Sequence, residues 1–540
     1  MRCADILPDD IERLKELLAA SELMIAELNA GILERDEVIV ARNDTVFDLQ
    51  EQLSTSSVEI EQLKLLIAKL RRMQFGRKSE KLDHQIEQME LKLEDLQADE
   101  SQTATEVEIA GKKPRRKFKR APLPAHLPRD EKIYPPAEES CPSCGAELRH
   151  LGEDVSEQLE FVPASFRVIR HIRPKMTCTC CDCIVQAPAP SRPIARGMAG
   201  PGLLAHVAVS KFADHLPFYR QSVIYAREGV DLDPGLLADW LGATAALVRP
   251  LVDAVARYVL AANKLHADDT PIPVLAPGNG KTKTGRLWTY VRDDGPSGST
   301  EPAAVWFAYT PDRKGIHPQT HLANFKGILQ ADAFAGFNAL FETGDIKEAA
   351  CWAHARRKFF DLYDARPSAV TKEALDRIGV LYEIEADIRG KPPDERRAIR
   401  QEKSLPLIDD FEHWLREALQ RLSRKSDTTA AIMYALNLWP ALKLYCDDGR
   451  IEIDNSAAER ALRGVAIGRR NYLFAGADSG GERAAAMYSL IGTAKLNGID
   501  PEAWLRHVLT HIADHPVNQV EDFLPWNCAK QIAAATTSKQ

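Results

Sequence analysis

A seven-residue hydrophobic repeat dominates the first seventy residues of this chain of 540 residues. Aliphatic side chains occupy nine successive positions seven residues apart, from Ile11 to Ile67, and no proline interrupts the segment from Ile11 to Leu70. Five of the nine positions that lie three residues further on are Leu, whereas Arg35 and Arg42 are among the polar exceptions. Such an a/d pattern keeps one narrow stripe turned toward a partner helix, and it predicts a left-handed coiled coil.

We therefore predict that residues 1–97 form a leucine-zipper-like oligomerisation region, most simply a dimer. The alternative is a single amphipathic helix that folds back on its own domain. The length and narrowness of the stripe favour self-association, since a helix on a globular core usually carries a wider apolar face.

The amino-acid composition excludes several classes of protein. An apolar content of 45% and a charged content of 27% exclude a wholly disordered chain, and the length predicts several domains. No apolar run approaches the 18 residues of a membrane span, and the first ten residues lack the apolar segment of a secretory signal, so we expect a cytoplasmic protein. The net charge of −8 argues against a chain that coats nucleic acid everywhere, but it allows a local basic face.

Residues 98–140 are typical of a linker that is rich in proline and basic residues. Seven of the nine residues from Lys112 to Arg120 are basic. The tract is either a solvated charged linker or a nonspecific contact to DNA phosphates, which releases counterions.

Six of the ten cysteines fall between Cys141 and Cys183, a clustering that indicates a metal site. The pair Cys141 and Cys144 has the C-x-x-C spacing of one half of a zinc site. Residues 178–183 offer two overlapping pairs for the other half, Cys178 with Cys181 and Cys180 with Cys183. Free thiols are the alternative, whereas a redox pair is disfavoured because no βαβ pattern surrounds the cysteines.

Apolar and polar residues alternate over residues 155–177, which predicts strands between the two halves of the zinc site. We therefore predict a zinc ribbon with a hairpin insert at 141–198. Its single Zn²⁺ would be structural, since four thiolates leave no open position. We also expect this domain to present a basic face made of Arg167, Arg170, His171, Arg173 and Lys175.

Residues 199–264 carry helix signals. Helices are predicted to begin at Pro201, at Pro217 and at Asp233-Pro234, where Asp at the N-cap precedes Pro at N1, and a longer helix is predicted from Val248 to Leu265. The short helices favour a helix-turn-helix-like DNA-binding unit, although any three-helix bundle would give a similar pattern.

The pattern changes to strands at Leu265. We predict strands at 265–275, 286–293, 304–310, 327–334 and 346–352, with helices at 317–326, 337–341 and 354–362. This order is typical of a ribonuclease-H-like core, an antiparallel meander that continues as a parallel sheet. The core would occupy 265–365 and 448–495, a helical insertion 366–447, and a C-terminal region with a flexible tail 496–540. The predicted fold class is therefore multidomain, α and α/β.

Three carboxylates are placed to converge in such a core. Asp268 lies inside the first apolar strand and Asp332 inside the fourth, and these two strands are neighbours in this topology. Glu459 lies near the start of a late helix that Asp454 or Asn455 caps. Three converging carboxylates suit two Mg²⁺ or Mn²⁺ ions about 4 Å apart, which can activate a nucleophile and stabilise the leaving oxygen of a phosphodiester.

Several basic residues are candidates for contact with DNA phosphates. His354 lies near the predicted centre or is a hydrogen-bonded structural residue at a strand–helix junction. Residues 468–471, together with Gly476, Gly480 and Gly481, predict a glycine-rich loop that grips phosphate without the spacing of a nucleotide-binding loop. The candidate DNA-binding residues are Arg356, Arg357, Arg460, Arg463, Arg469 and Arg470.

The chain resembles the insertion-sequence-66 family of bacterial DDE transposases over nearly its whole length. The resemblance is carried by the strings FGRKSEKL, CPSCG, ADHLPFYRQ, HADDTP, LQADAFAGFNAL, CWAHARRKFF, EIDNSAAERALR and GRRNYLFAGADSGGERAA. It implies that Asp268, Asp332 and Glu459 are the catalytic triad. It also implies Zn²⁺ bound by Cys141, Cys144, Cys178 and Cys181, although Cys180 and Cys183 leave the second pair open.

The resemblance implies a transposase that binds the ends of an insertion sequence and cuts and joins double-stranded DNA. Small accessory proteins of the same element would assist it, in the nucleoid of a bacterial cytoplasm. The alternatives are a DNA-binding regulator with an inactive core and another ribonuclease-H-like nuclease. The presence of all three carboxylates disfavours the regulator, and the predicted zipper and DNA-binding helices disfavour the nuclease.

Overall fold

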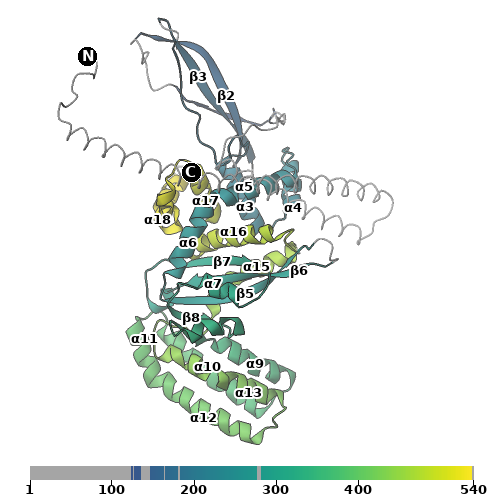
Figure 1. Ribbon diagram of the computed structural model, residues 1–540, viewed down its shortest axis with the longest axis vertical. Coiled ribbons are helices and arrows are strands. Elements are labelled where there is room, and N and C mark those ends of the chain that lie inside the picture. The colour runs from purple at the N-terminus through teal and green to yellow at the C-terminus, as the bar shows by residue number, and fades with distance from the viewer. Residues whose placement is uncertain are drawn as a thin grey trace, which may run out of the picture.

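The computed structural model describes residues 127–135, 146–162, 165–180, 183–276, 281–472 and 474–537, together with Leu123 and Ala125. The predicted coiled coil, the basic tract and three of the six clustered cysteines, Cys141, Cys144 and Cys181, lie outside the described residues. Figure 1 shows an elongated molecule with a long β-hairpin at one end, a sheet with its helices in the middle and a helical unit at the other end.

The hairpin consists of β2 (Leu148–Val162) and β3 (Ser165–Cys178), which pair antiparallel from end to end. This confirms the hairpin that the alternating sequence predicted between the two halves of the zinc site. Two short strands extend the sheet, β1 (Arg129–Ile133), parallel to β3, and β4 (Ile184–Gln186), antiparallel to it. Strand β1 lies in the segment that we predicted to be a linker.

The predicted basic face on β3 is wrong, because carboxylates of β1 and β2 neutralise it. Asp154 of β2 lies 2.7 Å from Lys175 and 3.4 Å from Arg173. His171 is buried, its ring contacts Gln158, and burial lowers its pKa to about 4. The two remaining ion pairs join Arg167 to Asp130 and Arg170 to Glu131.

Four helices lead from the hairpin to the central sheet. They are α3 (Pro201–Phe212), α4 (Phe218–Arg227), α5 (Pro234–Leu247) and α6 (Arg249–Leu260). The predicted start of α5 is confirmed, since the Asp233 side chain accepts a hydrogen bond from the N–H of Gly235. Helix α6 ends at Leu260, earlier than predicted, because β5 already begins at Lys264.

The central sheet has the strand order β7-β6-β5-β8-β9. Strands β5, β6 and β7 are antiparallel neighbours, whereas β8 and β9 run parallel to β5. The predicted adjacency of the first and fourth strands is therefore confirmed. The strands are β5 (Lys264–Val274), β6 (Lys283–Arg292), β7 (Ala304–Thr310), β8 (Gly327–Ala331) and β9 (Ile346–Ala350).

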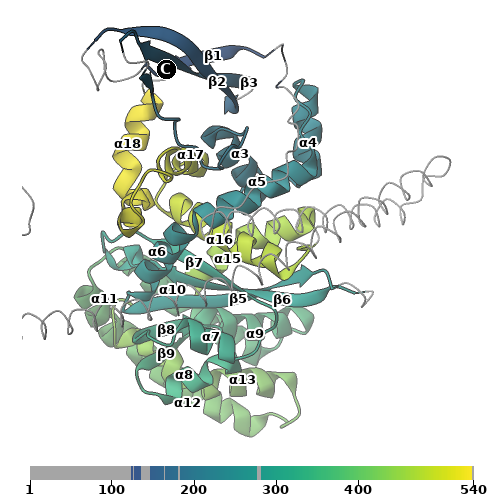
Figure 2. The ribbon, with the colours of Figure 1, turned by 45° about the horizontal axis from the view of Figure 1, so that its top comes forward.

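Helices α6, α15 (Ser456–Asn471) and α16 (Asp478–Leu496) cover one face of this sheet (Figure 2). On the other face, α7 (Ile316–His321) places His321 against Tyr290 and Trp306. Two helices follow β8 and β9, namely α8 (Asn338–Glu342) and α9 (Trp352–Ala365).

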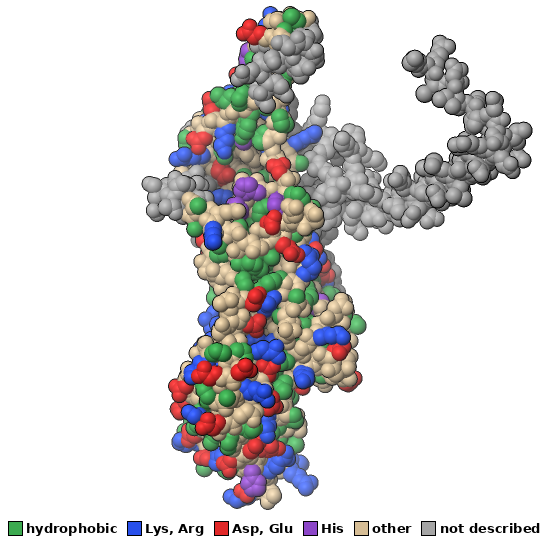
Figure 3. All heavy atoms as spheres, turned by 90° about the vertical axis from the view of Figure 1, so that its left-hand side faces the viewer, with side chains coloured by type: hydrophobic (Ala, Val, Ile, Leu, Met, Phe, Trp, Pro, Cys, Tyr) green, Lys and Arg blue, Asp and Glu red, His purple; other side chains and the backbone are tan. Residues whose placement is uncertain are grey.

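The predicted insertion is a helical unit with its own hydrophobic core, which includes Trp352 of α9 and Phe411 and Trp439 of the insertion. On the face shown in Figure 3, Lys and Arg side chains alternate with Asp and Glu side chains over this unit, without one dominant sign of charge. Its α-helices are α10 (Ala369–Ile388), α11 (Pro393–Ile399), α12 (Leu405–Arg421), α13 (Asp427–Asn437) and α14 (Trp439–Lys443).

The chain then returns to the sheet through α15 (Ser456–Asn471) and α16 (Asp478–Leu496). The C-terminal region, for which we predicted a flexible tail, forms α17 (Pro501–His511) and α18 (Pro525–Thr537), and α17 packs against α3. No single described helix is long and apolar enough to span a membrane. Helices α5 and α6, which meet at an angle of 53°, have the length and apolar composition of a membrane span only when they are counted together as one bent segment.

Candidate active site

The three predicted carboxylates come from β5, the end of β8 and the first turn of α15. Asp268 lies within β5, as predicted. Asp332 lies just beyond β8, not inside a strand as predicted, because the chain turns there: Ala333 has a φ of 60° and Asp332 Oδ1 accepts the N–H of Phe334. Glu459 belongs to the first turn of α15.

The electrostatics of Asp268 indicate that the other two carboxylates lie near enough to act on it. Burial raises the pKa of Asp268 to about 7, and the charges of Asp332, Asp269 and Glu459 act in the same direction. The N–H of Asp269 donates to Asp268 Oδ1 at 2.7 Å and opposes this rise. Among the described residues, Glu459 belongs to a group of ligand atoms that lie within 4.8 Å of one another, whereas Asp268 and Asp332 do not belong to that group.

The role of Asp269 could not be predicted from the sequence. Its side chain is almost wholly buried and pairs with Arg286 at 3.0 Å and with Arg313 at 2.7 Å. Arg313 also lies 3.8 Å from Asp332 Oδ2. Asp269 therefore holds an arginine beside the second carboxylate of the site, and its loss would disturb Asp332 as well.

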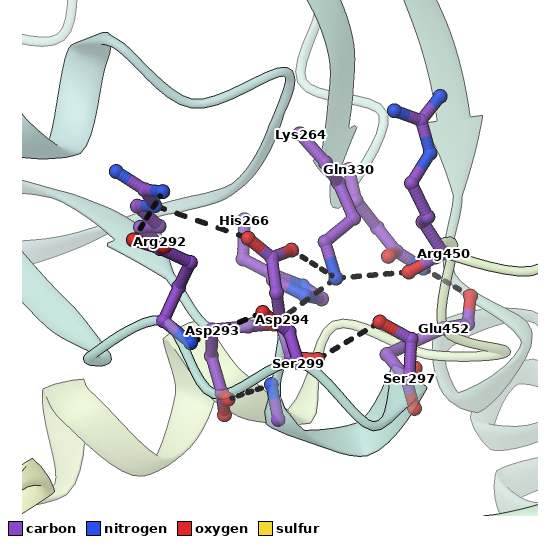
Figure 4. A network of polar contacts seen from close by, with 12 residues as sticks. Lys264, His266, Arg292, Asp293, Asp294, Ser297, Ser299, Gln330, Arg450 and Glu452 are labelled. Atoms are coloured by element: carbon purple, nitrogen blue, oxygen red, sulfur yellow. Dashed lines mark hydrogen bonds and ion pairs between the residues drawn. The ribbon is translucent and has the colours of Figure 1, made fainter. Parts of the chain in front are cut away.

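A buried polar network fixes the segment that leads into α15 (Figure 4). The Lys264 ammonium donates to the carbonyls of Asp293 and Arg450 at 3.0 and 2.9 Å and lies 3.4 Å from Asp294. The Gln330 side chain of β8 donates to the carbonyl of Glu452. Strands β5 and β8 thus both hold residues 450–452, only a few residues before Glu459.

The helical unit holds the same segment from the other side. Arg396 of α11 is buried and donates to the carbonyl of Gly449 and to Glu452 Oε1, both at 2.8 Å. A Cβ at Gly449 would lie 1.8 Å from the carbonyl oxygen of Pro393, so only glycine allows this close approach. The insertion therefore helps to place α15.

Asn455 is the residue that joins α15 to the strand that carries Asp268. It is fully buried, and its side-chain N–H donates to the carbonyl of Ala267 at 2.8 Å while its Oδ1 lies 3.1 Å from His266 Nδ1. Its backbone N–H donates to Cys351 Sγ at 3.2 Å. The sequence suggested only a capping role, but in the structure Asp454 accepts the N–H of Ser456 and the Asn455 side chain makes no cap.

We expect Asn455→Ala to lower any activity that depends on Glu459 about 10- to 100-fold, since ligand-positioning partners have effects of that size. The change should also lower the free energy of unfolding by about 1–3 kcal/mol, because the carbonyl of Ala267 and the ring of His266 lose a buried partner. Circular dichroism during urea unfolding and a cleavage assay measure the two effects. Asn471→Ala, at the far end of the same helix, is the matched control. If Asn455→Ala and Asn471→Ala have the same activity and the same free energy of unfolding, Asn455 does not position the helix that carries Glu459.

Asp268→Asn should stabilise the metal-free protein. The folded-state pKa of Asp268 is about 7, above the ordinary 3.8, so its stabilising contribution is present at low pH and is lost as the pH rises through 7. Asn keeps the neutral form at every pH, and the gain in unfolding free energy should be about 4 kcal/mol at pH 8 and about half of that at pH 5. Urea unfolding in a chelator measures it. If Asp268→Asn has a lower free energy of unfolding than the parent at pH 8, the Asp268 carboxylate is not destabilised by burial and by its negative neighbours, and this account of the site is wrong.

The candidate DNA-binding arginines differ in what they face. Arg356 and Arg357 of α9 are exposed and line a groove of about 690 Å³ beside Asp454. Arg463 and Arg470 are exposed on α15, whereas Arg469 turns inward and donates to the carbonyl of Pro271. The predicted glycine-rich loop at 468–471 is wrong, because these residues are the last turn of α15.

The described half of the predicted zinc site is the turn that follows β3. Cys178 is fully buried, and its Sγ accepts the N–H of Cys180 at 3.3 Å. The N–H of Cys178 donates to the carbonyl of Cys183 at 2.9 Å. An N–H···S bond inside a tight turn fits a thiolate held for a metal, so this geometry supports Cys178 as a ligand.

Four family models match successive parts of the chain. The model described as "Transposase IS66 family" matches residues 196–483, and "zinc-finger binding domain of transposase IS66" matches 138–182. "Transposase C of IS166 homeodomain", a leucine-zipper model, matches 62–131, and "IS66 C-terminal element" matches 489–526.

Curated relatives cover most of the chain. The uncharacterized protein y4hP of Sinorhizobium fredii is 43% identical over 88% of this chain and 90% of its own length. The uncharacterized protein y4qI of the same organism is 39% identical over 96% of this chain and 97% of its own length. A short match to the uncharacterized protein YuaK of Escherichia coli is 52% identical over 48 residues.

Proposed function

This chain belongs to the IS66 family of transposases, and on that premise we propose that it binds the ends of an insertion sequence and catalyses metal-dependent cleavage and transfer of DNA strands. The observation that supports the proposal is the environment of Asp268: burial raises its pKa to about 7, and the nearby charges of Asp332 and Glu459 act in the same direction. Perturbed carboxylates at the end of a sheet are typical of a catalytic centre.

The proposed catalytic core is ribonuclease-H-like. The strand order β7-β6-β5-β8-β9, antiparallel and then parallel, supports this fold. The helical unit interrupts the core between α9 and α15, and it makes up most of the 126 residues that lie between Asp332 and Glu459 in the sequence.

The donor set fits hard divalent cations. Asp268, Asp332 and Glu459 offer only oxygen ligands, which suit Mg²⁺ or Mn²⁺. Burial is the main cause of the raised pKa of Asp268, and the neighbouring negative charges that add to this rise are what such cations would relieve. When bound, a pair of these cations would supply activation of the nucleophile and stabilisation of the leaving oxygen.

The chain's own residues would place the DNA and hold the carboxylates. Arg356 and Arg357 along their groove, and Arg463 and Arg470 on α15, are proposed to bind DNA phosphates. Arg313, held by Asp269, orients Asp332, and Asn455 fixes the start of the helix that carries Glu459.

The proposed reaction has two steps. Hydrolysis at the element end leaves a 3′-hydroxyl, and that hydroxyl then attacks a phosphodiester of the target DNA. The second step breaks one phosphodiester bond and forms another, so it needs no ATP.

The parts outside the core serve assembly and DNA binding in this proposal. The zinc-finger family match supports a structural Zn²⁺, for which we propose Cys141, Cys144, Cys178 and Cys181 as ligands. The leucine-zipper match at 62–131 supports pairing of two copies, each on one element end. Small accessory proteins and the bacterial nucleoid are the proposed partners and place of action.

The experiment is a cleavage and joining assay with the purified full-length protein. A labelled duplex that carries the inverted repeat found beside the gene is incubated with Mg²⁺ or Mn²⁺ and a target plasmid, and a duplex with a scrambled repeat is the control. We expect cuts at the repeat boundary and joined products only with the true end. Binding without cutting would indicate a regulator, and cutting of branched DNA without end preference would indicate another nuclease.

A further inference from the structure

A second cluster of ligand atoms lies directly beside the proposed active site. Among the described residues, Cys351, His354 and Glu459 place one ligand atom each within 4.8 Å of the others. Cys351 is the N-cap of α9 and His354 lies in its first turn, while Glu459 comes from the first turn of α15. His354 Nε2 lies 3.8 Å from Glu459 Oε1. Two helix starts therefore bring a thiol, an imidazole and a carboxylate together.

Two features of the cluster point to a ligand. His354 Nδ1 is buried and has no hydrogen-bond partner. A buried polar atom without a partner costs about 1–3 kcal/mol, a cost that a bound ligand can remove. Cys351 Sγ already accepts the N–H of Asn455 at 3.2 Å, a contact that also stabilises a thiolate.

The donor set separates this cluster from the carboxylate centre. One sulfur, one nitrogen and one oxygen are the ligands of zinc-class cations, whereas Mg²⁺ prefers oxygen alone. Burial raises the pKa of the Cys351 thiol to about 12, so the metal-free thiol is neutral and binding of a cation would release its proton.

We propose that Cys351, His354 and Glu459 form a binding site for one zinc-class divalent cation, separate from the hard-ion centre of the carboxylates. Three protein ligands leave a fourth position open for a solvent molecule or a phosphate oxygen. Glu459 belongs to both groups, so a cation held by Cys351 and His354 withdraws part of its charge from Asp268 and Asp332. This second consequence, inhibition of Mg²⁺-dependent chemistry by zinc-class cations, rests on the proposed function, whereas the binding itself does not.

Binding is tested on the full-length protein with its zinc domain already loaded with Zn²⁺. Co²⁺ is then titrated in, and its visible absorption and sulfur charge-transfer bands report the site. The parent protein should bind one Co²⁺ more than either Cys351→Ser or His354→Gln. The His354→Gln variant is included because this side chain is partly exposed, so its replacement disturbs the fold less than replacement of the buried Cys351. Cys446→Ser, which replaces another buried thiol, is the matched control and should bind as the parent does. Equal Co²⁺ binding by the parent and both cluster variants, with all proteins folded by circular dichroism, would overturn the site.

The inhibitory consequence is measured as a change in Mg²⁺ requirement. Saturating Zn²⁺ should raise the Mg²⁺ concentration for half-maximal cleavage about tenfold or more in the parent and in Cys446→Ser, but much less in His354→Gln. An equal shift in all three proteins would overturn the inhibition. Extra Co²⁺ binding without any Mg²⁺-dependent cleavage would leave the cation site in place and contradict the proposed function instead.

Discussion

Asp268→Asn, Asp332→Asn and Glu459→Gln are each expected to lower strand cleavage and joining about 10³-fold or more. Each change keeps the shape of the side chain and removes one negative oxygen ligand. Specific binding to the element end should change by only a few fold, because the proposed DNA contacts come from dispersed arginines. Gel-shift and cleavage assays on the same end duplex measure the two quantities.

The effects of the three substitutions on the cleavage rate should not be additive, since the carboxylates act as one unit. A triple variant should be about as inactive as each single variant. Asp345→Asn is the matched control, because it lies at the other end of the β8–β9 pair, where its exposed carboxylate pairs with the exposed Lys326. Asp269 is unsuited as a control, since its carboxylate is buried against Arg286 and Arg313. Near-normal cleavage by any of the three site variants would contradict the assignment.

Cys178→Ser is expected to abolish zinc binding by the zinc-finger domain, so the zinc content falls by one ion per chain. Cys178 is buried and its sulfur accepts the N–H of Cys180, whereas Cys180 is exposed. Loss of a structural zinc should unfold the turn around residues 141–183 and expose it to proteases. Atomic absorption on the purified protein and limited proteolysis measure these effects.

Cys180→Ser, two residues away, is the matched control and should keep the zinc. The structure also places Cys183 against Cys178, so the second pair needs a direct test. The proposed pairing would be wrong if a variant with both Cys180 and Cys183 replaced by Ser loses the zinc while Cys178→Ser keeps it.

The sequence predicted the elements whose signals are local. Strand β7 has the predicted bounds, because an apolar run in Ala304–Thr310 lies between turn residues. Helix α5 begins where Asp233 and Pro234 predicted, because a cap depends only on its own neighbours. Helix α6 was predicted too long because Ala261 and Ala262 favour helix locally, whereas the following strand must pair with β8. That pairing is a tertiary constraint, which a local pattern does not contain.

The site was predictable only in part, for the same reason. A charge within an apolar strand drew attention to Asp268, and a capped helix start drew attention to Glu459. The supports of these residues come from far away in the chain: Asn455 bonds to Ala267, and Arg313 pairs with Asp269. Contacts across such separations leave no periodic signal. The basic face was predicted wrongly because its neutralising carboxylates lie on other strands.

The central claim is that Asp268, Asp332 and Glu459 hold divalent cations directly during DNA cleavage. The most direct measurement is cleavage by Asp332→Cys in Mg²⁺ and in Mn²⁺, since Asp332 lies just beyond the end of β8 and its replacement leaves the strand unchanged. A thiolate ligand disfavours the hard Mg²⁺ more than Mn²⁺. We predict a variant that is inactive in Mg²⁺ and recovers at least about tenfold in Mn²⁺, while Asp332→Asn stays inactive in both. A folded Asp332→Cys that cleaves normally in Mg²⁺, or that Mn²⁺ restores no better than Asp332→Asn, would contradict direct metal binding at this position.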